Sequence, residues 1–548
     1  MPVVISSLYT MSGFIKSFFE KNNVAFFTCL IFGCACGAVF RFDMEWWDFA
    51  NYHYYNAWAF LNGRLGVDSV PAFINTFFSP FIELPSYFLT NALNDHPVIF
   101  STVMAVPYGL LLFAVCKIAT LFFPADTKQG RIKTGLTLLL CICSVPVFME
   151  LSGTTHEHPM SFLVLTALYL LLKKIPSRLI DTKTCLISGF ILGVAAGLKM
   201  TYCLYAAATG LSLILFSKRF DRPVKSIVSF TLAGTAGFLI AYGYWGWILW
   251  KNFESPFFPF LNGVFQSPYW NAPEYRDVRY FNLPWLNVVF YPLHQFLYVG
   301  GDFSIHHRFI LSHLRIVVGM IPFAAFLYDF IKECLTRKKK NPADDDTLMS
   351  FLMLWMTIAY VFWLGIFRVY RYMIPFELML SIVLVHFFFR KETFSLKSVS
   401  FTVRLFAVLL FSVLVGNECM HLPYSRSIDK PLLPAKALPV QDDTLILVDF
   451  VPGSVFIPFL APNPTVRAVL SPRITYSVNG SAFHTYGHFA KKRDELIAEH
   501  KKRGKPVAYI VGRPFYSLHE RLDEICTNLG VLSGSDYYIR YFLCPDRK

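Results

Sequence analysis

The chain has 548 residues, of which 55% are hydrophobic and 16% are charged, and its mean hydropathy is +0.46. A soluble domain usually has about 25% charged residues, so this composition excludes an ordinary water-soluble protein. The formal net charge of +14 does not indicate nucleic-acid binding, because the basic residues lie in short loops between apolar segments rather than on one face of a folded domain.

About eleven apolar segments are candidates to cross a hydrocarbon core of roughly 30 Å as helices. They are 23–40, 98–123, 133–149, 160–173, 184–198, 201–216, 226–250, 311–330, 348–366, 372–389 and 400–416. With the N-terminus in the cytoplasm, five loops rich in Lys and Arg all fall on the cytoplasmic side, as the positive-inside rule requires. We therefore expect a bacterial inner-membrane protein with a periplasmic C-terminus.

The apolar segment 73–91 is interrupted by Pro80 and Pro85. If it crossed the membrane, the alternation of basic loops would fail. We therefore predict a membrane-surface or re-entrant segment here.

After residue 416 the pattern changes to short strands, expected at 444–450, 507–511 and 537–542, and charged helices, expected at 488–502 and 518–529. Strands that alternate with helices predict a small soluble α/β domain. We expect an all-α polytopic membrane bundle at 1–416, a Pro-rich linker at 417–440 and an extracytoplasmic α/β domain at 441–548. Cys526 and Cys544 are the one candidate disulfide pair, because the other cysteines are scattered, mostly within spans.

The first outer loop begins with three acids, Asp43, Glu45 and Asp48, among aromatic residues. A carboxylate held among Trp and Tyr at the membrane surface is partly desolvated, which can raise its pKa towards the range of a general base. The alternative is an aromatic belt with solvated acids.

A polar turn between two later spans contains His156, Glu157 and His158. These three side chains could bind a divalent cation or a phosphate. A solvated turn before a helix that starts near Pro159 is the alternative.

Three basic residues stand where the topology disfavours them. Lys199 interrupts an apolar run, and ionisable residues at membrane depth usually face a polar cavity. Arg368 and Arg371 lie at the outer end of a span, and Arg is suited to bidentate phosphate binding. The alternatives are a lysine that snorkels to the surface and arginines that contact lipid headgroups.

Several of these motifs together resemble the bacterial membrane glycosyltransferases of the GT-C fold. They are Asp48-Phe-Ala-Asn-Tyr-His53, the turn Thr155-His-Glu-His-Pro159, Gly197-Leu-Lys199, the segment Lys251-Asn-Phe-Glu-Ser-Pro-Phe-Phe-Pro-Phe-Leu-Asn262, and Arg371-Tyr-Met-Ile-Pro375. The resemblance covers roughly residues 20 to 416.

The resemblance implies transfer of a sugar from a polyprenyl-phosphate carrier to an acceptor glycan or lipid outside the cytoplasm, with inversion. It implies Asp48 as the base, with Asp43 and Glu45 as alternatives. The implied substrate-binding set is Tyr52, His53, His156, Glu157, His158, Lys199, Arg368, Arg371 and Tyr372. This sequence departs from the best-known subfamilies, which often carry an Asp-Glu pair in the first loop and an Asp where Glu157 stands. The resemblance therefore assigns neither the sugar nor a metal.

Two other kinds of function remain open on the sequence. A transporter or flippase of lipid-linked glycans would place ionisable residues near the bilayer midplane, whereas here the charges cluster at the outer ends of spans. A glycan polymerase or ligase would use the same class of donor.

Overall fold

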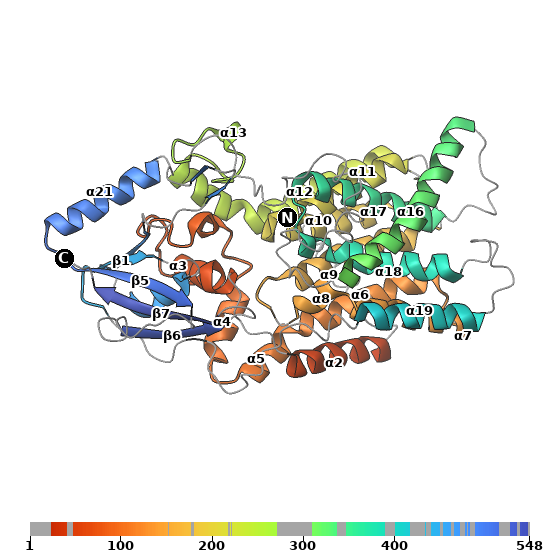
Figure 1. The fold of residues 1–548 in the computed structure, drawn as a ribbon. Helices are drawn as coiled ribbons and strands as arrows, with labels where there is room; N and C mark the ends of the chain where they lie inside the picture. The colour runs from red at the N-terminus through yellow and green to blue at the C-terminus, as the bar shows by residue number, and fades with distance from the viewer. Residues whose placement is uncertain are drawn as a thin grey trace.

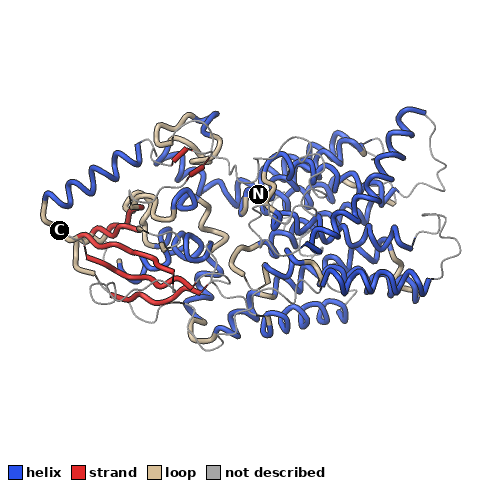
Figure 2. Tube along the Cα trace, in the orientation of Figure 1, coloured by secondary structure: helices blue, strands red, loops and turns tan. Residues whose placement is uncertain are grey.

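The computed structural model describes residues 23–40, 48–151, 153–176, 180–217, 220, 222–270, 310–336, 347–389, 401–416, 433, 440–449, 453–461, 465–471, 477–478, 481–482, 488–514, 527–533 and 538–545. Asp43, Glu45 and Cys526 therefore lie outside the described residues, as does most of the expected linker. In the described part, a helical bundle and a β-sheet lie at opposite ends, with the first outer loop between them (Figures 1 and 2).

Each of the eleven expected spans coincides with a helix or with a pair of consecutive helices. The helices are α2 (Asn23–Val39), α5 (Pro97–Met104), α6 (Val106–Phe122), α7 (Lys128–Ile142), α8 (Val145–Met149), α9 (Glu157–Lys174), α10 (Thr182–Leu198), α11 (Cys203–Leu215), α12 (Pro223–Phe253), α16 (Ile310–Thr336), α17 (Thr347–Ile366), α18 (Ile374–Phe389) and α19 (Phe401–Gly416). Two of the spans are each divided into two helices near a proline. The break between α5 and α6 precedes Pro107, and the break between α7 and α8 precedes Pro146. Proline has no backbone N–H with which to continue the helical hydrogen bonds.

Four helical stretches are long and apolar enough to cross a bilayer. They are Pro97–Phe122, Pro223–Phe253, Thr347–Ile366 and Tyr370–Phe389. Five shorter apolar helices accompany them in the described residues. The chain is therefore an integral membrane protein, as predicted, while the sidedness of its ends stays a prediction.

The helices α10 and α12 pack closely through glycines. A Cβ atom at Gly189 would lie 2.2 Å from the carbonyl oxygen of Phe230, and one at Gly193 would lie 2.0 Å from that of Gly234. Only glycine permits such an approach of two backbones, as at other membrane helix interfaces. This contact fixes the C-terminal end of α10, where Lys199 stands.

The first outer loop forms short helices rather than a span. They are the π-helix η1 (Phe49–His53), α3 (Tyr54–Leu61), the 3-10 helix η2 (Phe73–Phe77) and α4 (Leu84–Ala92). A helix of the length of α4 extends only about 14 Å, well short of the bilayer core. Trp245 of α12 donates its indole N–H to the Phe77 carbonyl oxygen at 3.0 Å, which fixes this segment on the bundle. These lengths agree with the prediction that 73–91 does not span.

The C-terminal part contains a five-stranded mixed sheet in the order β2-β1-β5-β7-β6. Its elements are β1 (Leu445–Val448), the 3-10 helix η9 (Ser454–Phe456), α20 (Ile457–Leu460), β2 (Arg467–Leu470), α21 (His488–Lys502), β5 (Val507–Pro514), β6 (Thr527–Ser533) and β7 (Tyr538–Pro545). The strand β1 runs parallel to β2 and β5, whereas β7 runs antiparallel to β5 and β6. A two-stranded hairpin of β3 (Ser477–Val478) and β4 (Ser481–Ala482) lies outside this sheet.

The three expected strands and the helix at 488–502 are confirmed. Of the helix expected at 518–529, only residues 527–529 are described. The prediction is wrong there, because these residues belong to β6. Pairing with β7 satisfies the backbone groups of this segment, and such long-range pairing overrides a short helical pattern.

The sheet packs directly on the first outer loop. Arg64 donates to the Val466 carbonyl oxygen at 2.5 Å, Asp68 accepts from the Ala468 amide at 2.8 Å, and Tyr54 shares a hydrophobic core with Ile446 of β1. The loop and the C-terminal part therefore lie on the same side of the bundle, which the predicted topology requires.

Candidate active site

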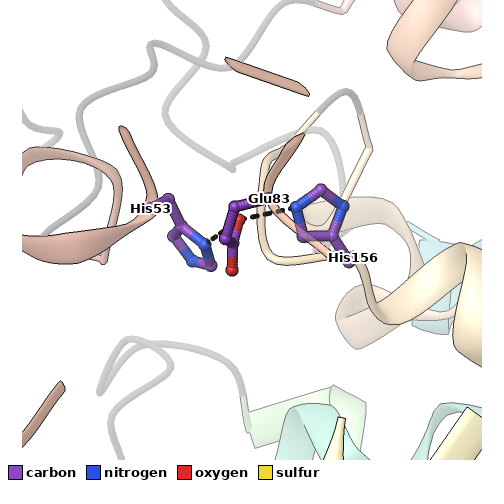
Figure 3. A group of neighbouring side chains, drawn as sticks. All are labelled: His53, Glu83 and His156. Atoms are coloured by element: carbon purple, nitrogen blue, oxygen red, sulfur yellow. Dashed lines mark hydrogen bonds and ion pairs between the residues drawn. The ribbon is translucent and has the colours of Figure 1, made fainter. Parts of the chain in front are cut away.

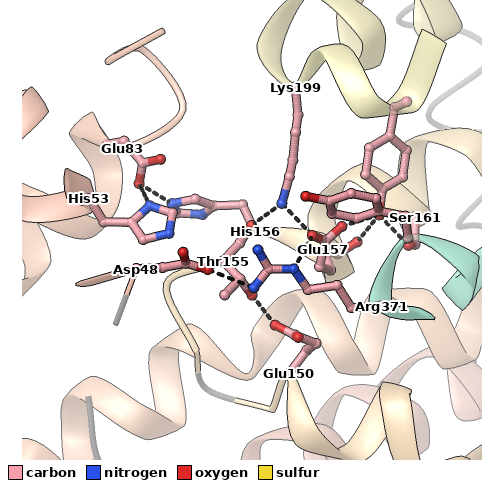
Figure 4. Close-up of polar contacts among 12 residues, drawn as sticks. Asp48, His53, Glu83, Glu150, Thr155, His156, Glu157, Ser161, Lys199 and Arg371 are labelled. Carbon is pink, nitrogen blue, oxygen red and sulfur yellow. Dashed lines mark hydrogen bonds and ion pairs between the residues drawn. The ribbon is translucent and has the colours of Figure 1, made fainter. Parts of the chain in front are cut away.

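A cluster of charged side chains forms where the outer ends of the helices meet the first loop (Figure 4). Its carboxylates are Asp48, Glu83, Glu150 and Glu157, and its permanent cations are Lys199 and Arg371, with His53 and His156 beside them. The expected meeting of the first loop, the polar turn, Lys199 and Arg371 is therefore observed.

Asp48 and Arg371 form the central ion pair. Asp48 stands at the N-cap of η1, Arg371 lies in the 3-10 helix η6 (Tyr370–Met373), and Arg371 Nη1 donates to Asp48 Oδ2 at 2.6 Å. Burial alone would raise the pKa of Asp48, but Arg371, His53 and Lys199 together hold this pKa below its usual value. The expected rise in the pKa of this acid is therefore wrong, because the guanidinium of Arg371 lies against the carboxylate.

Glu157 is the second carboxylate bound by the basic residues. Its side chain is fully buried at the start of α9, accepts from Tyr202 OH at 2.7 Å and forms an ion pair with Lys199. Lys199 also donates to the Thr155 carbonyl oxygen at 2.6 Å, and Arg371 Nε lies 3.8 Å from Glu157 Oε1. The break after α10 thus directs Lys199 into the cluster.

Glu150 lies next to this pair and accepts a hydrogen bond from the hydroxyl of Thr155. Burial raises the pKa of Glu150, Arg371 opposes this change, and the charge of Glu157 adds to it. Glu150 is therefore more inclined to hold a proton than a solvated glutamate is. The sequence analysis assigned no role to this residue.

Two of the expected tyrosines line the cluster. The ring of Tyr372 lies 5.5 Å from the Arg371 guanidinium and 5.7 Å from Lys199 Nζ, which are cation-π distances. Tyr52 is buried, and its ring centroid lies 4.2 Å from that of His53.

Two other expected residues turn to different surroundings. Arg368 donates Nε–H to the Leu364 carbonyl oxygen at 2.8 Å, at the end of α17. His158 contacts the Val147 carbonyl oxygen at 2.8 Å and lies 5.2 Å from the ring of Tyr108. Both contacts engage neighbouring helices.

The expected cation site of His156, Glu157 and His158 is wrong as a set. Their side chains point to Glu83, Lys199 and Val147 respectively, because a helical start at Glu157 directs successive side chains to different faces. Among the described residues, the group that could hold a metal ion is instead His53, Glu83 and His156, whose ligand atoms lie within 4.8 Å of one another (Figure 3).

Glu83 is the residue that the sequence analysis missed. It was assigned to the apolar segment at the membrane surface, without a role. A lone acid within an apolar segment near the membrane was the available signal, because such residues usually face a polar site.

Comparisons with known proteins include a distant likeness to solved structures. No family model and no curated protein matches this chain. Crystal structures of ArnT from Cupriavidus metallidurans, one bound to undecaprenyl phosphate and one in the apo state, are 12% and 14% identical to it. Each aligns over 97% of this chain and 98% of the ArnT chain with a TM-score of 0.40, values that by themselves assign no activity.

Proposed function

We propose that this protein is a membrane glycosyltransferase that moves a sugar from a polyprenyl-phosphate carrier to an extracytoplasmic glycan or lipid. The observation that carries the proposal is the Asp48 and Arg371 ion pair, with Lys199 and Glu157 beside it, at the outer end of the bundle. The sequence resemblance to GT-C glycosyltransferases supplies the class of donor. A bacterial inner-membrane location follows from the same reasoning.

Arg371 is suited to bind the phosphate of the donor. In the described part of the chain, its guanidinium makes one hydrogen bond, to Asp48, and its buried Nε has no hydrogen-bond partner. The side chain is 23% exposed, so a ligand can reach it. Arg forms a planar fork of donors that matches phosphate oxygens, which supports this role.

Lys199 would assist through its charge. It is 18% exposed, and the carbonyl of Thr155 and the carboxylate of Glu157 hold its ammonium in place. Negative charge grows on the phosphate as it leaves the sugar, so fixed cations stabilise the transition state more than the ground state.

Asp48 would act as the general base. In the proposed step, the acceptor hydroxyl oxygen bonds to the anomeric carbon, its proton passes to Asp48, and the carbon-oxygen bond to the phosphate breaks with inversion. Polyprenyl phosphate leaves with the bonding electron pair.

Arg371 links binding of the donor phosphate to proton transfer at Asp48. A donor phosphate that binds Arg371 competes with Asp48 for the guanidinium, which weakens the interaction that lowers the pKa of Asp48. We propose that the base becomes stronger when the donor is bound, so that proton transfer is favoured only with both substrates present.

The proposal is tested by sugar transfer in purified membranes. Polyprenyl phosphate carrying a radiolabelled sugar is supplied with membranes that contain or lack the protein, and labelled acceptor and free polyprenyl phosphate are measured. Equal amounts of single-sugar product and released carrier support the proposal. Label that crosses the bilayer still attached to its carrier would indicate a flippase, and long labelled chains or whole transferred glycans would indicate a polymerase or ligase.

A further inference from the structure

A second group of polar side chains joins three separate segments of the chain. His53 ends η1, Glu83 immediately precedes α4, and His156 immediately precedes α9. Glu83 Oε2 lies 2.6 Å from His53 Nδ1 and 2.8 Å from His156 Nε2, so two imidazole nitrogens meet at one carboxylate oxygen (Figure 3). All three side chains are at least nine-tenths buried.

Hydrogen bonding does not account for the position of His53. Both of its ring nitrogens are buried, and among the described residues neither has a hydrogen-bond partner of acceptable geometry, although Nδ1 approaches the Glu83 oxygen closely. An unpartnered polar ring in the protein interior is costly and usually indicates a ligand or an ordered water.

His156 is held in an unusual backbone conformation. Its φ angle is 61°, in the left-handed region that non-glycine residues seldom occupy. It occupies the N-cap of α9 but makes no side-chain cap hydrogen bond, and its ring instead points to Glu83. The turn is therefore shaped to present Nε2 to the other two residues.

The donor set has the composition of a transition-metal site. Two imidazole nitrogens and one carboxylate oxygen, with a further position for water or substrate, are the ligands of many catalytic zinc sites. Magnesium and calcium prefer all-oxygen ligands, so they fit poorly here. At metal-ligand distances of about 2.0–2.2 Å, tetrahedral ligand atoms stand roughly 3.4 Å apart. The nitrogen-oxygen distances of 2.6 and 2.8 Å would each need to lengthen by less than about 1 Å.

The charge of the surroundings also favours a cation. The cluster contains four carboxylates and two permanent cations, a formal excess of two negative charges. We propose that His53 Nδ1, Glu83 Oε2 and His156 Nε2 bind a divalent transition-metal ion of the zinc class. The bound ion would fasten the first outer loop to the polar turn, on the side of the cluster where Asp48 lies (Figure 4).

The test measures metal rather than transfer, so its result is independent of the proposed function. The full chain, with an affinity tag that contains no histidine, is purified into lipid nanodiscs and equilibrated with buffered micromolar Zn²⁺. We expect about one tightly bound zinc per chain by mass spectrometry of the metal content. We expect zinc, but not Mg²⁺, to raise the unfolding temperature of the wild-type protein, because a ligand that binds only the folded state stabilises it.

Variants assign the zinc to these residues. His53→Ala, Glu83→Gln and His156→Ala should each weaken zinc binding more than tenfold, whereas the matched control His96→Ala, at an exposed histidine, should bind as the wild type does. Wild-type protein without stoichiometric zinc and without a zinc-dependent rise in unfolding temperature would overturn the proposal. Full zinc binding in folded His53→Ala and His156→Ala would also overturn it.

Discussion

Two ion-pair regions of this protein use the same kinds of residue in opposite ways. In the outer cluster, Asp48 and Arg371 are 14% and 23% exposed. Inside the bundle, Arg315 of α16 and Glu377 of α18 are 1% and 0% exposed, and Nη1 of Arg315 lies 3.6 Å from the carboxylate. The first pair is open to a ligand, and the second is closed.

The inner pair is surrounded by further contacts from α18 and from η6. Arg315 Nη2 donates to Ser381 Oγ at 2.6 Å, and Tyr370 OH donates to Glu377 Oε1 at 2.5 Å. These contacts join α16 to α18 and fix the residue that directly precedes Arg371. The comparison teaches that accessibility, rather than charge alone, distinguishes a reactive site from a structural one.

The largest expected effect is that of Asp48→Asn on turnover. The amide keeps the shape but cannot accept the proton, and a positioned general base typically contributes about 10² to 10⁴ in rate. Steady-state transfer should fall by that factor while donor binding is largely kept. Asp43→Asn and Glu45→Gln are the controls and should cost far less. If one of them abolishes transfer and Asp48→Asn does not, another acid of the same loop is the base.

A substitution in the inner pair should lower the stability of the protein rather than its turnover. Glu377→Gln leaves Arg315 buried without a counter-charge, and breaking such a pair typically costs about 3–5 kcal/mol. Thermal unfolding in nanodiscs should show a large loss. The double variant Arg315→Met with Glu377→Leu should recover most of it, because an apolar pair avoids the desolvation of two charges. A double variant less stable than Glu377→Gln would contradict a structural role.

Arg371→Lys tests whether the outer cluster needs the planar donors of Arg371 or only its positive charge. Lysine keeps the charge but loses the planar fork, and a hydrogen bond to a charged group is worth about 1.5–3 kcal/mol. Transfer should therefore fall by roughly 10- to 100-fold, while the protein still inserts and unfolds at its usual temperature. Wild-type turnover in this variant would instead support the alternative that Arg371 contacts lipid headgroups.

The smallest expected effect is that of Glu150→Gln on stability. The pKa of Glu150 is raised in the folded state, so this acid destabilises the fold as the pH rises above its unfolded pKa of about 4.3. The variant should match the wild type near pH 4 and unfold at a slightly higher temperature at pH 7. A lower unfolding temperature at pH 7 would show that the charged form of Glu150 is stabilising.

Much of the fold could be predicted because a bilayer restricts the choices. Apolar length and basic loops located the helices, and the two prolines near 73–91 indicated that this segment does not span. The sequence could not predict that the C-terminal sheet packs on the first loop. Contacts such as that of Arg64 with Val466 join residues 402 positions apart, and no local pattern encodes them.

Some members of the candidate site were predictable, but its full membership and its chemistry were not. Asp48 was identified from its aromatic surroundings, Lys199 because it interrupts an apolar run, and Arg371 because the positive-inside rule disfavours its position. The direction of the pKa shift of Asp48 was wrong because its partner lies 323 residues away. Glu83 was missed because the role of a lone acid becomes visible only once two distant histidines meet it.

The most direct test compares the same chemical change in the two regions. Asp48→Asn and Glu377→Gln are prepared in parallel in nanodiscs, and the sugar transferred from a polyprenyl-phosphate donor is measured per folded molecule. The account predicts that Asp48→Asn loses about 10² to 10⁴ in turnover with a smaller fall in unfolding temperature than Glu377→Gln shows. It predicts that Glu377→Gln keeps its turnover per folded molecule but unfolds at a lower temperature. Normal transfer by Asp48→Asn, or a loss of turnover confined to folded Glu377→Gln, would contradict it.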